Sequence, residues 1–406
     1  MIVVDSMLKG EGTEDGVQIN AVDFFYAAMP EVTLDADGSQ DALLVRVRSD
    51  SGLEGWGECE ASPLVSIAAF VTPRSHGVCQ PVAASVLGET IEQPADIARL
   101  SANLRRNSMD LLQAAHTWSG VEMALWDLLG KHHGLPVWQL LGYEQNLSKQ
   151  PYASLLFGAT PEETYKRGND AVAAGYTAVK FGWGGFGGGA LEADRDQLRA
   201  ARDGIGGAQL MVDAGQIWDD DVDAASLRIP LLEESGVLWL EEPFSPYDYR
   251  AHAELARRSP NVSLAGGEAS HNPEMAKNLI RFGGVRFVQI DTGRVGGIGA
   301  SKEVADFAAA EGVTYVNHSF TSHLALAASL HAFAGQASSA LCEFPLALSP
   351  LARAVTTVAL EPDAERRVSA PGGPGLGVSV DLAGVGQYLR DVEIRVGGEL
   401  LTAVAV

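Results

Sequence analysis

From about residue 151 onward, short apolar segments alternate with helical segments in a regular series. Helical patterns such as those of residues 190–204 and 299–312 lie between segments with the length and composition of strands. The strand candidates cover residues 152–158, 176–182, 208–215, 236–243, 261–268, 286–291, 313–319 and 340–345. Strands joined by helical crossovers form parallel sheets, and eight such units close into a barrel. The series therefore predicts a parallel (β/α) barrel.

The residues before this series follow a different pattern. Residues 42–58 alternate between apolar and polar positions around a turn, which is typical of an antiparallel hairpin. Residues 117–134 carry apolar residues at helical spacing and end in a glycine. We therefore expect three parts, which are an α+β domain over residues 1–142, the barrel over 150–355 and a C-terminal segment over 356–406 that returns to the first domain.

Composition excludes several classes of function. The formal net charge is −23, and because an acidic surface repels phosphate backbones, we expect no nucleic-acid partner. No apolar stretch reaches the ~20 residues of a membrane helix, and we see no signal peptide, so we expect a cytoplasmic protein with no membrane partner. The three cysteines form no CxxC pair, which argues against a disulfide framework or zinc site. Barrels of this kind often assemble, so we expect a homo-oligomer.

Ionisable residues stand at the C-terminal ends of seven successive strand candidates. They are Lys180, Asp213, Glu241, Glu268, Asp291, His318 and Glu343. In parallel barrels the active site forms at the C-terminal strand ends, so we expect these side chains to converge there. Strand alternation supports this expectation, because Leu238 and Leu240 share one face of their strand. Trp239 and Glu241 share the other face, so we expect Glu241 to point into the barrel and Glu242 to point away from it.

Three of these residues, Asp213, Glu241 and Glu268, are carboxylates on adjacent strands. Carboxylates held together in a semi-buried mouth repel one another unless a cation neutralises them. Because the donors are oxygens, with no paired His or Cys nearby, the pattern indicates Mg²⁺ rather than zinc. Taken singly, each carboxylate could instead cap a helix or pair with a lysine.

The other four residues favour proton transfer. Asp291 and His318 lie on neighbouring strands, and a carboxylate beside an imidazole orients the ring and raises its pKa, as a general base requires. Lys180 lies across the mouth, where a dication would lower its pKa and make it a second candidate base. A salt bridge for Lys180 and a structural role for His318 are the alternatives. Glu343 either donates a hydrogen bond in its protonated form or caps a helix.

The segments VDAG, WLEEP and AGGE, which contain the three carboxylates, resemble the metal-binding pattern of the enolase superfamily. Residues 119–142, 288–308 and 371–378 are similar to stretches typical of its mandelate racemase and muconate-lactonizing branch. The resemblance implies a (β/α)₇β barrel capped by an α+β domain built from both termini. It also implies that Asp291 and His318 form a catalytic dyad and that Glu343 helps to bind the intermediate. The three Mg²⁺ ligands that it implies are Asp213, Glu241 and Glu268.

Two positions depart from the family pattern. The family usually carries two basic residues on the second strand, whereas this chain has only Lys180. Counted from Gly175, Lys180 fits the first position and Gly182 the second. Counted back from the FGW segment, Lys180 fits the second position and Ala178 the first. The family also often has Asn two residues after its first metal ligand, where this chain has Gly215.

The resemblance implies that the enzyme removes a proton next to a substrate carboxylate to form an enediolate that Mg²⁺ stabilises. We expect a small anionic carboxylate as substrate and the dehydration of an acid sugar, an aldonate or aldarate, to a 2-keto-3-deoxy acid. Racemisation or epimerisation, and cycloisomerisation, are alternatives. We expect substrate choice to come from the loops around residues 16–31 and 51–62, with four aromatic residues to consider as substrate contacts or as core: Phe24, Phe25, Tyr26 and Trp56.

Two other interpretations remain. Gly182, Gly184 and Gly187 spell GxGxxG between a strand and a helix, and Asp213 ends the next strand, as in a nicotinamide-dependent oxidoreductase. Such a fold normally carries its fingerprint on the first strand, and this interpretation leaves the other strand-end residues without roles. The second is a barrel that binds metal and ligand without turnover, since one strand-two base is missing.

Overall fold

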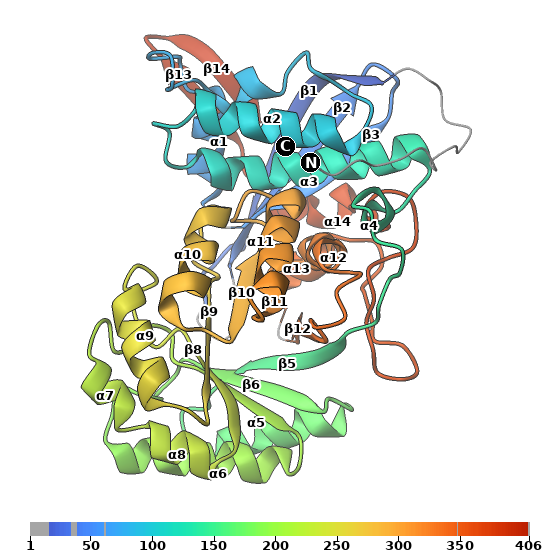
Figure 1. Ribbon diagram of the computed structural model, residues 1–406. Helices are drawn as coiled ribbons and strands as arrows, with labels where there is room; N and C mark the ends of the chain where they lie inside the picture. Colours follow the sequence, from blue (N-terminus) through green and yellow to red (C-terminus); the bar gives the residue numbers. More distant parts are fainter. Residues whose placement is uncertain (1–15, 34–38, 61, 347, 405–406) are drawn as a thin grey trace.

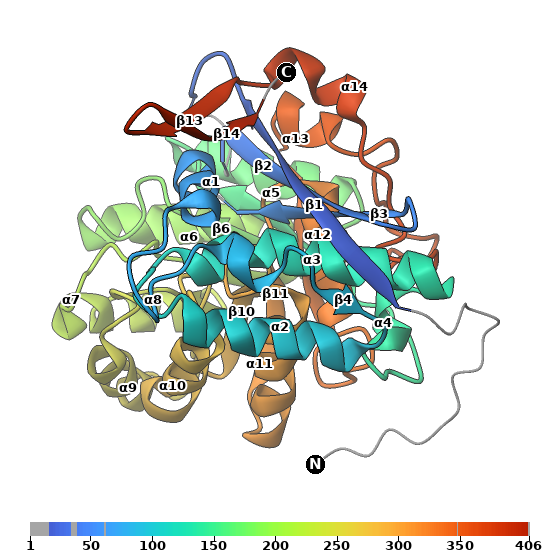
Figure 2. The same cartoon turned by 90° about the horizontal axis from the view of Figure 1, so that it is seen from above.

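The chain folds into a cap of strands and helices that stands on a parallel barrel (Figure 1). The computed structural model describes residues 16–33, 39–60, 62–346 and 348–404. Within these ranges the strands form one sheet of four, one of eight and one of two. Seen from above, the strands and long helices of the cap cover the barrel (Figure 2). The predicted fold class, a parallel barrel with an α+β cap, is therefore confirmed.

The cap is built on an antiparallel sheet with the strand order β3-β2-β1-β4. Its strands are β1 (Val17–Ala28), β2 (Asp41–Ser49), β3 (Glu54–Cys59) and β4 (Thr90–Ile91). Its helices are α1 (Pro63–Val71), η1 (Val82–Ser85), α2 (Pro94–Asn107), α3 (Ala114–His133) and α4 (Val137–Leu140). The predicted hairpin is the β2–β3 pair, which ends at the Arg48–Glu54 pair. Most of the segment 16–31, which we expected to form a loop, is instead the long strand β1.

Helix α3 packs closely on β3 because β3 carries glycines where the helix passes. A Cβ atom at Gly55 would lie 2.0 Å from the carbonyl oxygen of Ala124, and one at Gly57 would lie 2.1 Å from that of Gly120. Any larger residue at these two positions would force the helix away from the sheet. The close approach buries α3 almost completely, so its apolar residues form the centre of the cap core.

The barrel has eight parallel strands in the hydrogen-bonded order β11-β10-β9-β8-β7-β6-β5-β12. The strands are β5 (Gln150–Leu156), β6 (Ala178–Gly182), β7 (Gln209–Asp213), β8 (Val237–Glu241), β9 (Ser263–Gly266), β10 (Phe287–Asp291), β11 (Thr314–His318) and β12 (Leu341–Pro345). The connecting helices are α5 (Pro161–Ala173), α6 (Leu191–Ile205), α7 (Val222–Ser226), α8 (Ile229–Glu234), α9 (Tyr249–Arg258), α10 (Pro273–Gly283), α11 (Ile298–Ala310) and α12 (His323–Ala332). The predicted (β/α)₇β barrel is confirmed.

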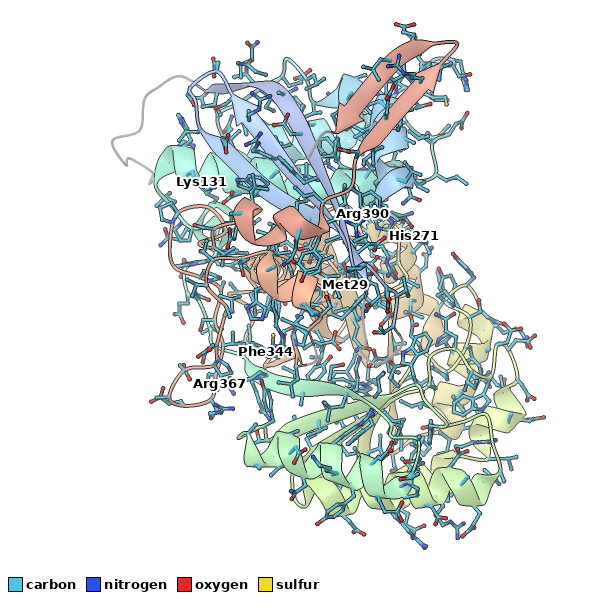
Figure 3. All side chains as sticks on the ribbon, turned by 180° about the vertical axis from the view of Figure 1, so that it is seen from behind. Met29, Lys131, His271, Phe344, Arg367 and Arg390 are labelled. Carbon is cyan, nitrogen blue, oxygen red and sulfur yellow. The ribbon has the colours of Figure 1, made fainter. Side chains whose placement is uncertain are left out.

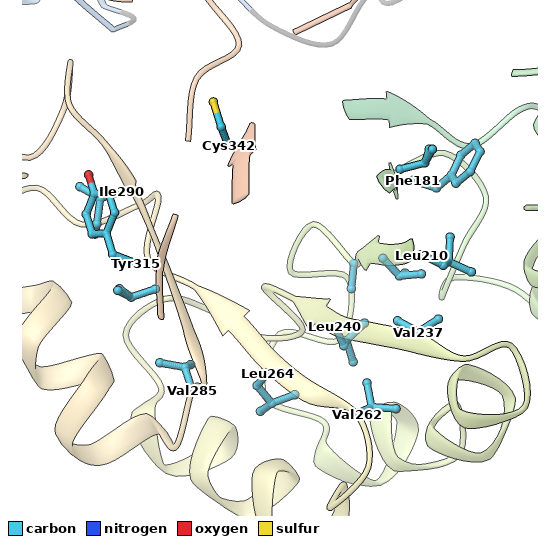
Figure 4. Packing of buried hydrophobic residues seen from close by; sticks show 14 of the residues in the cluster. Phe181, Leu210, Val237, Leu240, Val262, Leu264, Val285, Ile290, Tyr315 and Cys342 are labelled. Atoms are coloured by element: carbon cyan, nitrogen blue, oxygen red, sulfur yellow. The ribbon is translucent and has the colours of Figure 1, made fainter. Parts of the chain in front are cut away.

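Strand alternation divides the barrel residues into an outer and an inner layer. Leu210, Leu240 and Ile290 belong to the outer cluster of buried residues that the helices cover (Figure 4). Met211, next to Leu210, and Trp239, next to Leu240, belong to the inner cluster. The period-two pattern of the sequence therefore predicted these positions correctly. Leu238, which was expected on the outer face with Leu240, instead packs against the inner cluster, where the register of β7 and β8 shifts.

A side chain joins the last two barrel strands. Oδ1 of Asn317 on β11 accepts a hydrogen bond from the backbone N–H of Glu343 on β12 at 2.9 Å. Nδ2 of Asn317 donates to the carbonyl oxygen of Glu343 at 3.2 Å. Asn317 thus holds the backbone of Glu343 beside the strand that carries His318.

The C-terminal segment returns to the cap. It contains α13 (Pro350–Ala354), α14 (Leu382–Val385), η2 (Gly386–Tyr388) and the hairpin of β13 (Val392–Val396) and β14 (Glu399–Val404). The backbone N–H of Arg390 donates to the carbonyl oxygen of Tyr26 at 2.8 Å, and Nη2 donates to that of Ala28 at 2.7 Å. Figure 3 shows Arg390 close to Met29, where the cap meets the barrel. Among the described residues, no helix has the length and apolar character to span a membrane.

Candidate active site

The residues at the strand ends meet at the C-terminal mouth of the barrel. Asp213, Glu241, Asp291 and His318 are the last residues of β7, β8, β10 and β11. Gly182, Asp213 and Glu241 lie directly opposite one another in the register of β6, β7 and β8. The other three predicted residues deviate slightly from the strand ends: Lys180 and Glu343 lie within β6 and β12, and Glu268 follows β9 by two residues.

Lys180 is surrounded by carboxylates. Its Nζ lies 2.7 Å from Oε1 of Glu241, 2.9 Å from Oε1 of Glu343 and 3.8 Å from Oδ2 of Asp213. Burial lowers the pKa of Lys180, but the charges of Glu241 and Glu343 outweigh burial and hold this pKa well above its usual value. Lys180 is therefore an ammonium ion in this structure. It forms the salt bridge that the sequence indicated as the alternative to a role as a base.

His318 lies between two carboxylates. Its Nδ1 is 2.9 Å from Oδ2 of Asp291, and its Nε2 is 3.1 Å from Oε2 of Glu268. Burial lowers the pKa of His318, but the charges of Glu268, Glu343 and Asp291 raise it well above its usual value. The other oxygen of Asp291, Oδ1, accepts a hydrogen bond from the backbone N–H of Gly293 at 2.7 Å. The predicted neighbours Asp291 and His318 are thus in direct contact, in an orientation that Asp291 fixes.

Glu343 completes the acidic side of the mouth. Its Oε2 accepts a hydrogen bond from the backbone N–H of Ser319 at 2.9 Å. Burial raises the pKa of Glu343, but the nearby Lys180 and His318 lower it below its usual value overall. Glu343 is therefore an ionised acceptor rather than the protonated donor of one sequence-based alternative. The other alternative, a helix cap, does not hold for the following helix α13, because Ser349 caps it.

The three predicted metal ligands are not assembled around a common point. Within the described part of the chain, no group of three or more His, Cys, Asp or Glu side chains has a geometry that could hold a metal ion. Glu241 is paired with Lys180, and Glu268 is paired with His318. Two cations of the protein itself therefore neutralise carboxylates that we expected to bind Mg²⁺.

The chemistry of this group of residues nevertheless fits a hard cation. Asp213, Glu241 and Glu268 supply oxygen donors on three consecutive barrel strands. Burial raises the pKa of Glu241 to about 7, and it also raises the pKa of Glu268. One further carboxylate oxygen, Oε1 of Glu242, is buried without a hydrogen-bond partner. The mouth therefore holds more buried carboxylates than its own cations can neutralise. A divalent cation would stabilise the ionised forms of these carboxylates.

Both parts of the chain match models of known protein families. Residues 26–142 match the mandelate racemase / muconate lactonizing enzyme N-terminal domain, and residues 163–384 match the enolase C-terminal domain-like family. The chain belongs to the enolase superfamily. Its branch is that of mandelate racemase and the muconate lactonizing enzyme, as the resemblance of its motifs implied.

Known proteins similar to this enolase-superfamily enzyme include one solved structure with high identity. The crystal structure of a predicted mandelate racemase from Rhodobacter sphaeroides is 56% identical, covers 96% of this chain and 100% of its own, and has a TM-score of 0.92. D-galactarolactone cycloisomerase from Agrobacterium fabrum is 28% identical over 84% of this chain and 89% of its own length. L-talarate/galactarate dehydratase from Salmonella typhimurium is 28% identical over 68% of this chain and 67% of its own length.

Glu242, which was expected to point away from the barrel, lies in the turn after β8 and is buried. Its Oε2 accepts a hydrogen bond from Nε2 of Gln216 at 2.8 Å. Strand β8 ends at Glu241, and Glu242 has a φ of 39°. Because alternation holds only along an extended strand, it does not predict the direction of a side chain in the following turn.

Sequence reasoning missed an ion pair between the cap and the barrel. Nε and Nη2 of Arg294, which follows β10, both lie 2.8 Å from Oε2 of Glu60, which follows β3. Nη1 of Arg294 donates to the carbonyl oxygen of Glu268 at 3.1 Å. Arg294 lies in a segment that resembles the family, but no local pattern indicates that Glu60, so distant in sequence, is its partner.

The four candidate aromatic residues of the cap have different positions. Phe24 is core, with its ring centroid 4.8 Å from that of Phe70. Phe25 and Trp56 pack on each other with ring centroids 5.5 Å apart. Tyr26 alone among the four lines the large cavity described below. Phe24, Phe25 and Trp56 therefore have a packing role, which was the alternative to contact with the substrate.

The nicotinamide-binding alternative is wrong, because its fingerprint glycines serve packing. Gly182 ends the second strand of a barrel, not the first strand of an open sheet. A Cβ atom at Gly184 would lie 3.1 Å from Cβ of Phe157, and one at Gly187 would lie 3.0 Å from the indole of Trp218. The family assignment agrees, since it places this segment in the enolase-type barrel.

A cavity of about 1080 Å³ opens between the cap and the ends of β5 and β6. Leu156, at the end of β5, lines it and lies opposite Gly182, which in turn lies opposite Asp213. The cavity therefore adjoins the acidic mouth. Its other lining residues come from the end of β1, the start of β2 and the segment between them, from the loops after β5 and β6, and from α5. They include Tyr26, Met29, Asp41, Phe157, Arg167 and Trp183.

Proposed function

We propose that this enzyme dehydrates an acid sugar, an aldonate or aldarate, to a 2-keto-3-deoxy acid in the presence of Mg²⁺. The observation that carries the proposal is that His318, oriented by Asp291, shares a mouth of buried carboxylates with Lys180. Relatives that act on acid sugars support the substrate class, because they include the L-talarate/galactarate dehydratase and a D-galactonate dehydratase from Variovorax paradoxus.

Asp213, Glu241 and Glu268 would hold the Mg²⁺ ion. When bound there, Mg²⁺ supplies positive charge that offsets the second negative charge created on the substrate carboxylate. Glu241 and Glu268 would have to exchange their present contacts with Lys180 and His318 for this role. Lys180 would keep its contact with Glu343, which lies outside the proposed ligand set.

His318 is the proposed base. Asp291 accepts the hydrogen bond from Nδ1, so Nε2 is the nitrogen that can take a proton. Once Glu268 no longer occupies Nε2 and His318 has released its Nε2 proton to solvent, this atom can remove the proton from the carbon next to the carboxylate, and the C–H electron pair forms the enediolate. The same nitrogen can return its proton to the β-hydroxyl, which leaves as water while the enol of the 2-keto-3-deoxy acid forms.

The second strand argues against racemisation as the main reaction. A transfer between opposite faces of one carbon requires two bases, and the register places Gly182, without a side chain, in the row of Asp213 and Glu241. Lys180 lies two residues deeper in the barrel and is bound by two carboxylates. Dehydration needs only one group that removes and returns a proton, and His318 can fulfil both roles.

Cycloisomerisation is the second candidate. It is favoured by the match to D-galactarolactone cycloisomerase, which extends over 84% of this chain and 89% of that protein. The two reactions share proton removal by His318 and differ in whether an oxygen leaves as water or remains bonded to the carbon chain.

The predictions of a homo-oligomer and of a cytoplasmic location remain predictions.

A screen of acid sugars tests the proposal. The purified protein is incubated with MgCl₂ and with aldonates, aldarates and their lactones, and the products are scored by NMR for 2-keto-3-deoxy acids and for rearranged lactones. In D₂O, exchange of the α proton reports the first step even without a product. We expect a 2-keto-3-deoxy acid from at least one member, and its loss in Asp213→Asn. Neither product nor exchange from any member would refute the proposal, and full activity in EDTA would refute the role of the metal.

A further inference from the structure

Trp183 has an unusual position at the edge of the barrel mouth. It directly follows Gly182, the last residue of β6, and it is 53% exposed although it is a large aromatic residue. Its φ is 54°, in the left-handed region that bulky residues rarely adopt. Residues held in such conformations cluster at ligand-binding sites, where the surrounding structure maintains them.

Two contacts hold Trp183 in this conformation. Its backbone N–H donates to the carbonyl oxygen of Asp213 at 3.2 Å. Its indole lies against Gly215, where a Cβ atom would be 2.9 Å from Cδ2 and 3.0 Å from Cε2 of Trp183. Any side chain at position 215 would therefore displace the indole. The glycine that departs from the family pattern thus makes room for Trp183.

Trp183 forms part of the wall of the 1080 Å³ cavity beside the mouth. Phe157, Tyr26 and Met29 contribute further apolar surface to this wall. Arg167 also lines the cavity, and its Nη1 donates to the carbonyl oxygens of Leu156 and Phe157 at 2.9 and 3.3 Å, which fixes the guanidinium group. Aromatic walls with a few fixed polar groups are typical of sites that bind small organic ligands.

We infer that Trp183 is a substrate-binding residue whose indole contacts the carbon chain of the acid sugar beyond its reacting carboxylate. The inference rests on the proposed function, because the acidic mouth determines which end of the substrate reacts. The C–H groups of the chain pack on the ring face, and Arg167 lies in the same cavity to meet an oxygen-rich or anionic far end. Trp183 therefore contributes to substrate affinity and to the choice of chain length, not to proton transfer.

Three variants test this inference with the best substrate from the screen. Trp183→Ala should raise KM by about 10- to 100-fold and change kcat by less than about threefold, as expected for a residue that binds substrate uniformly. Trp183→Phe, which keeps a ring, should lie between the wild type and Trp183→Ala. Tyr247→Ala is the matched control, because Tyr247 is 64% exposed and does not line the cavity. It should leave KM unchanged.

A double-mutant cycle tests the contact with Gly215. Asn tolerates a positive φ, so Gly215→Asn should fold and should raise KM chiefly by displacing the indole. In the Trp183→Ala background the same substitution should have little further effect. Additive effects on KM would show that Gly215 does not act through Trp183. Thermal melting of each variant separates these effects from loss of folded protein.

Fluorescence provides a readout that does not require turnover. Galactarate with MgCl₂ is titrated into the wild type and into Trp183→Phe, and the difference between the two signals reports Trp183 itself. A saturable difference supports the inference even if the protein dehydrates nothing, in which case only the proposed reaction fails. Turnover with an unchanged KM in Trp183→Ala overturns the inference alone. If the wild type neither binds nor converts any acid sugar, both proposals are overturned.

Discussion

Nζ of Lys180 lies 2.7 Å from Oε1 of Glu241, so the protein itself neutralises the carboxylate at the centre of its proposed metal site. Both side chains are almost completely buried, with exposed fractions of 4% for Lys180 and 0% for Glu241. A buried carboxylate without a counter-ion is costly, so a lysine in this position stabilises the metal-free barrel. The same lysine then competes with the cation for Glu241.

Replacing Lys180 tests this competition. Lys180→Met should lower the free energy of unfolding of the metal-free protein by about 3–5 kcal/mol, because it leaves buried carboxylates without a partner. MgCl₂ should restore more stability in the variant than in the wild type. Urea unfolding with EDTA and with MgCl₂ measures both effects.

Lys302→Met is the matched control for Lys180→Met. Lys302 pairs with Asp306 at 2.6 Å, but the Asp306 side chain is 52% exposed, so this pair should contribute less than about 1 kcal/mol. Equal effects of MgCl₂ on the wild type and on Lys180→Met would contradict competition between the lysine and the metal.

Direct titration tests the metal ligands. The wild type should bind Mg²⁺ in calorimetry, and Glu241→Gln should weaken binding by about 100-fold or more, because it removes a charged oxygen donor from the site. Glu254→Gln, on the surface helix α9, should bind as the wild type does. Unchanged affinity in Glu241→Gln would place the metal elsewhere.

Exchange of the α proton identifies the base. His318→Asn should reduce solvent deuterium exchange by about 10²- to 10⁴-fold, the range of general-base catalysis. Asp291→Asn should reduce it less, because the ring loses its orienting partner but keeps Nε2. NMR in D₂O measures both rates. Exchange at the wild-type rate in His318→Asn would assign proton removal to Lys180.

His331 predicts a loss of stability in acid. It is fully buried, its Nδ1 accepts a hydrogen bond from the backbone N–H of Trp138 at 3.2 Å, and its Nε2 faces the carbonyl oxygen of Leu376 at 3.3 Å. Burial lowers the pKa of His331 to about 4. In the unfolded chain the imidazole of His331 binds a proton near pH 6.5. The contribution of the buried neutral ring to the free energy of unfolding is therefore complete above pH 6.5 and is lost as the pH falls towards 4. This contribution amounts to about 3 kcal/mol.

His331→Gln should remove this pH dependence while keeping an acceptor and a donor at the same place. Chemical unfolding at several pH values between 4.5 and 7.5 measures the slope of stability against pH. His76→Gln, at an exposed histidine, serves as the control. Parallel curves for the wild type and His331→Gln would show that His331 does not cause acid sensitivity.

Glu122 on α3 of the cap docks the cap on the barrel. Its Oε2 accepts a hydrogen bond from the backbone N–H of Ile298 at 2.6 Å, and its Oε1 accepts one from that of Gly299 at 2.9 Å. A Cβ atom at Gly297, whose φ is 99°, would lie 2.1 Å from Oε2 of Glu122. Gly297→Ala should therefore lower the free energy of unfolding by about 2–4 kcal/mol.

Gly312→Ala is the matched control for this contact. Its φ is also positive, at 71°, but a Cβ atom there would meet nothing within 4 Å. It should show only the backbone cost, about 1 kcal/mol. Thermal and urea unfolding of the two variants measure the difference, and equal losses would mean that Glu122 does not constrain position 297.

The sequence predicted the barrel and the positions of its ionisable residues with little error. Asp213, Glu241, Asp291 and His318 do end their strands, and Trp239 does face inward. These properties depend on the order of residues along single strands, and the period-two geometry of a strand transmits that order directly to the two faces of a sheet.

Only the tertiary structure decided which charges meet. It paired Lys180 with Glu241 and Glu343, turned Glu242 into a buried position and joined Arg294 to Glu60 of the cap. It also showed that Gly215 accommodates Trp183. Such contacts depend on the directions of side chains from strands and loops far apart in the sequence, and no local periodicity encodes those directions.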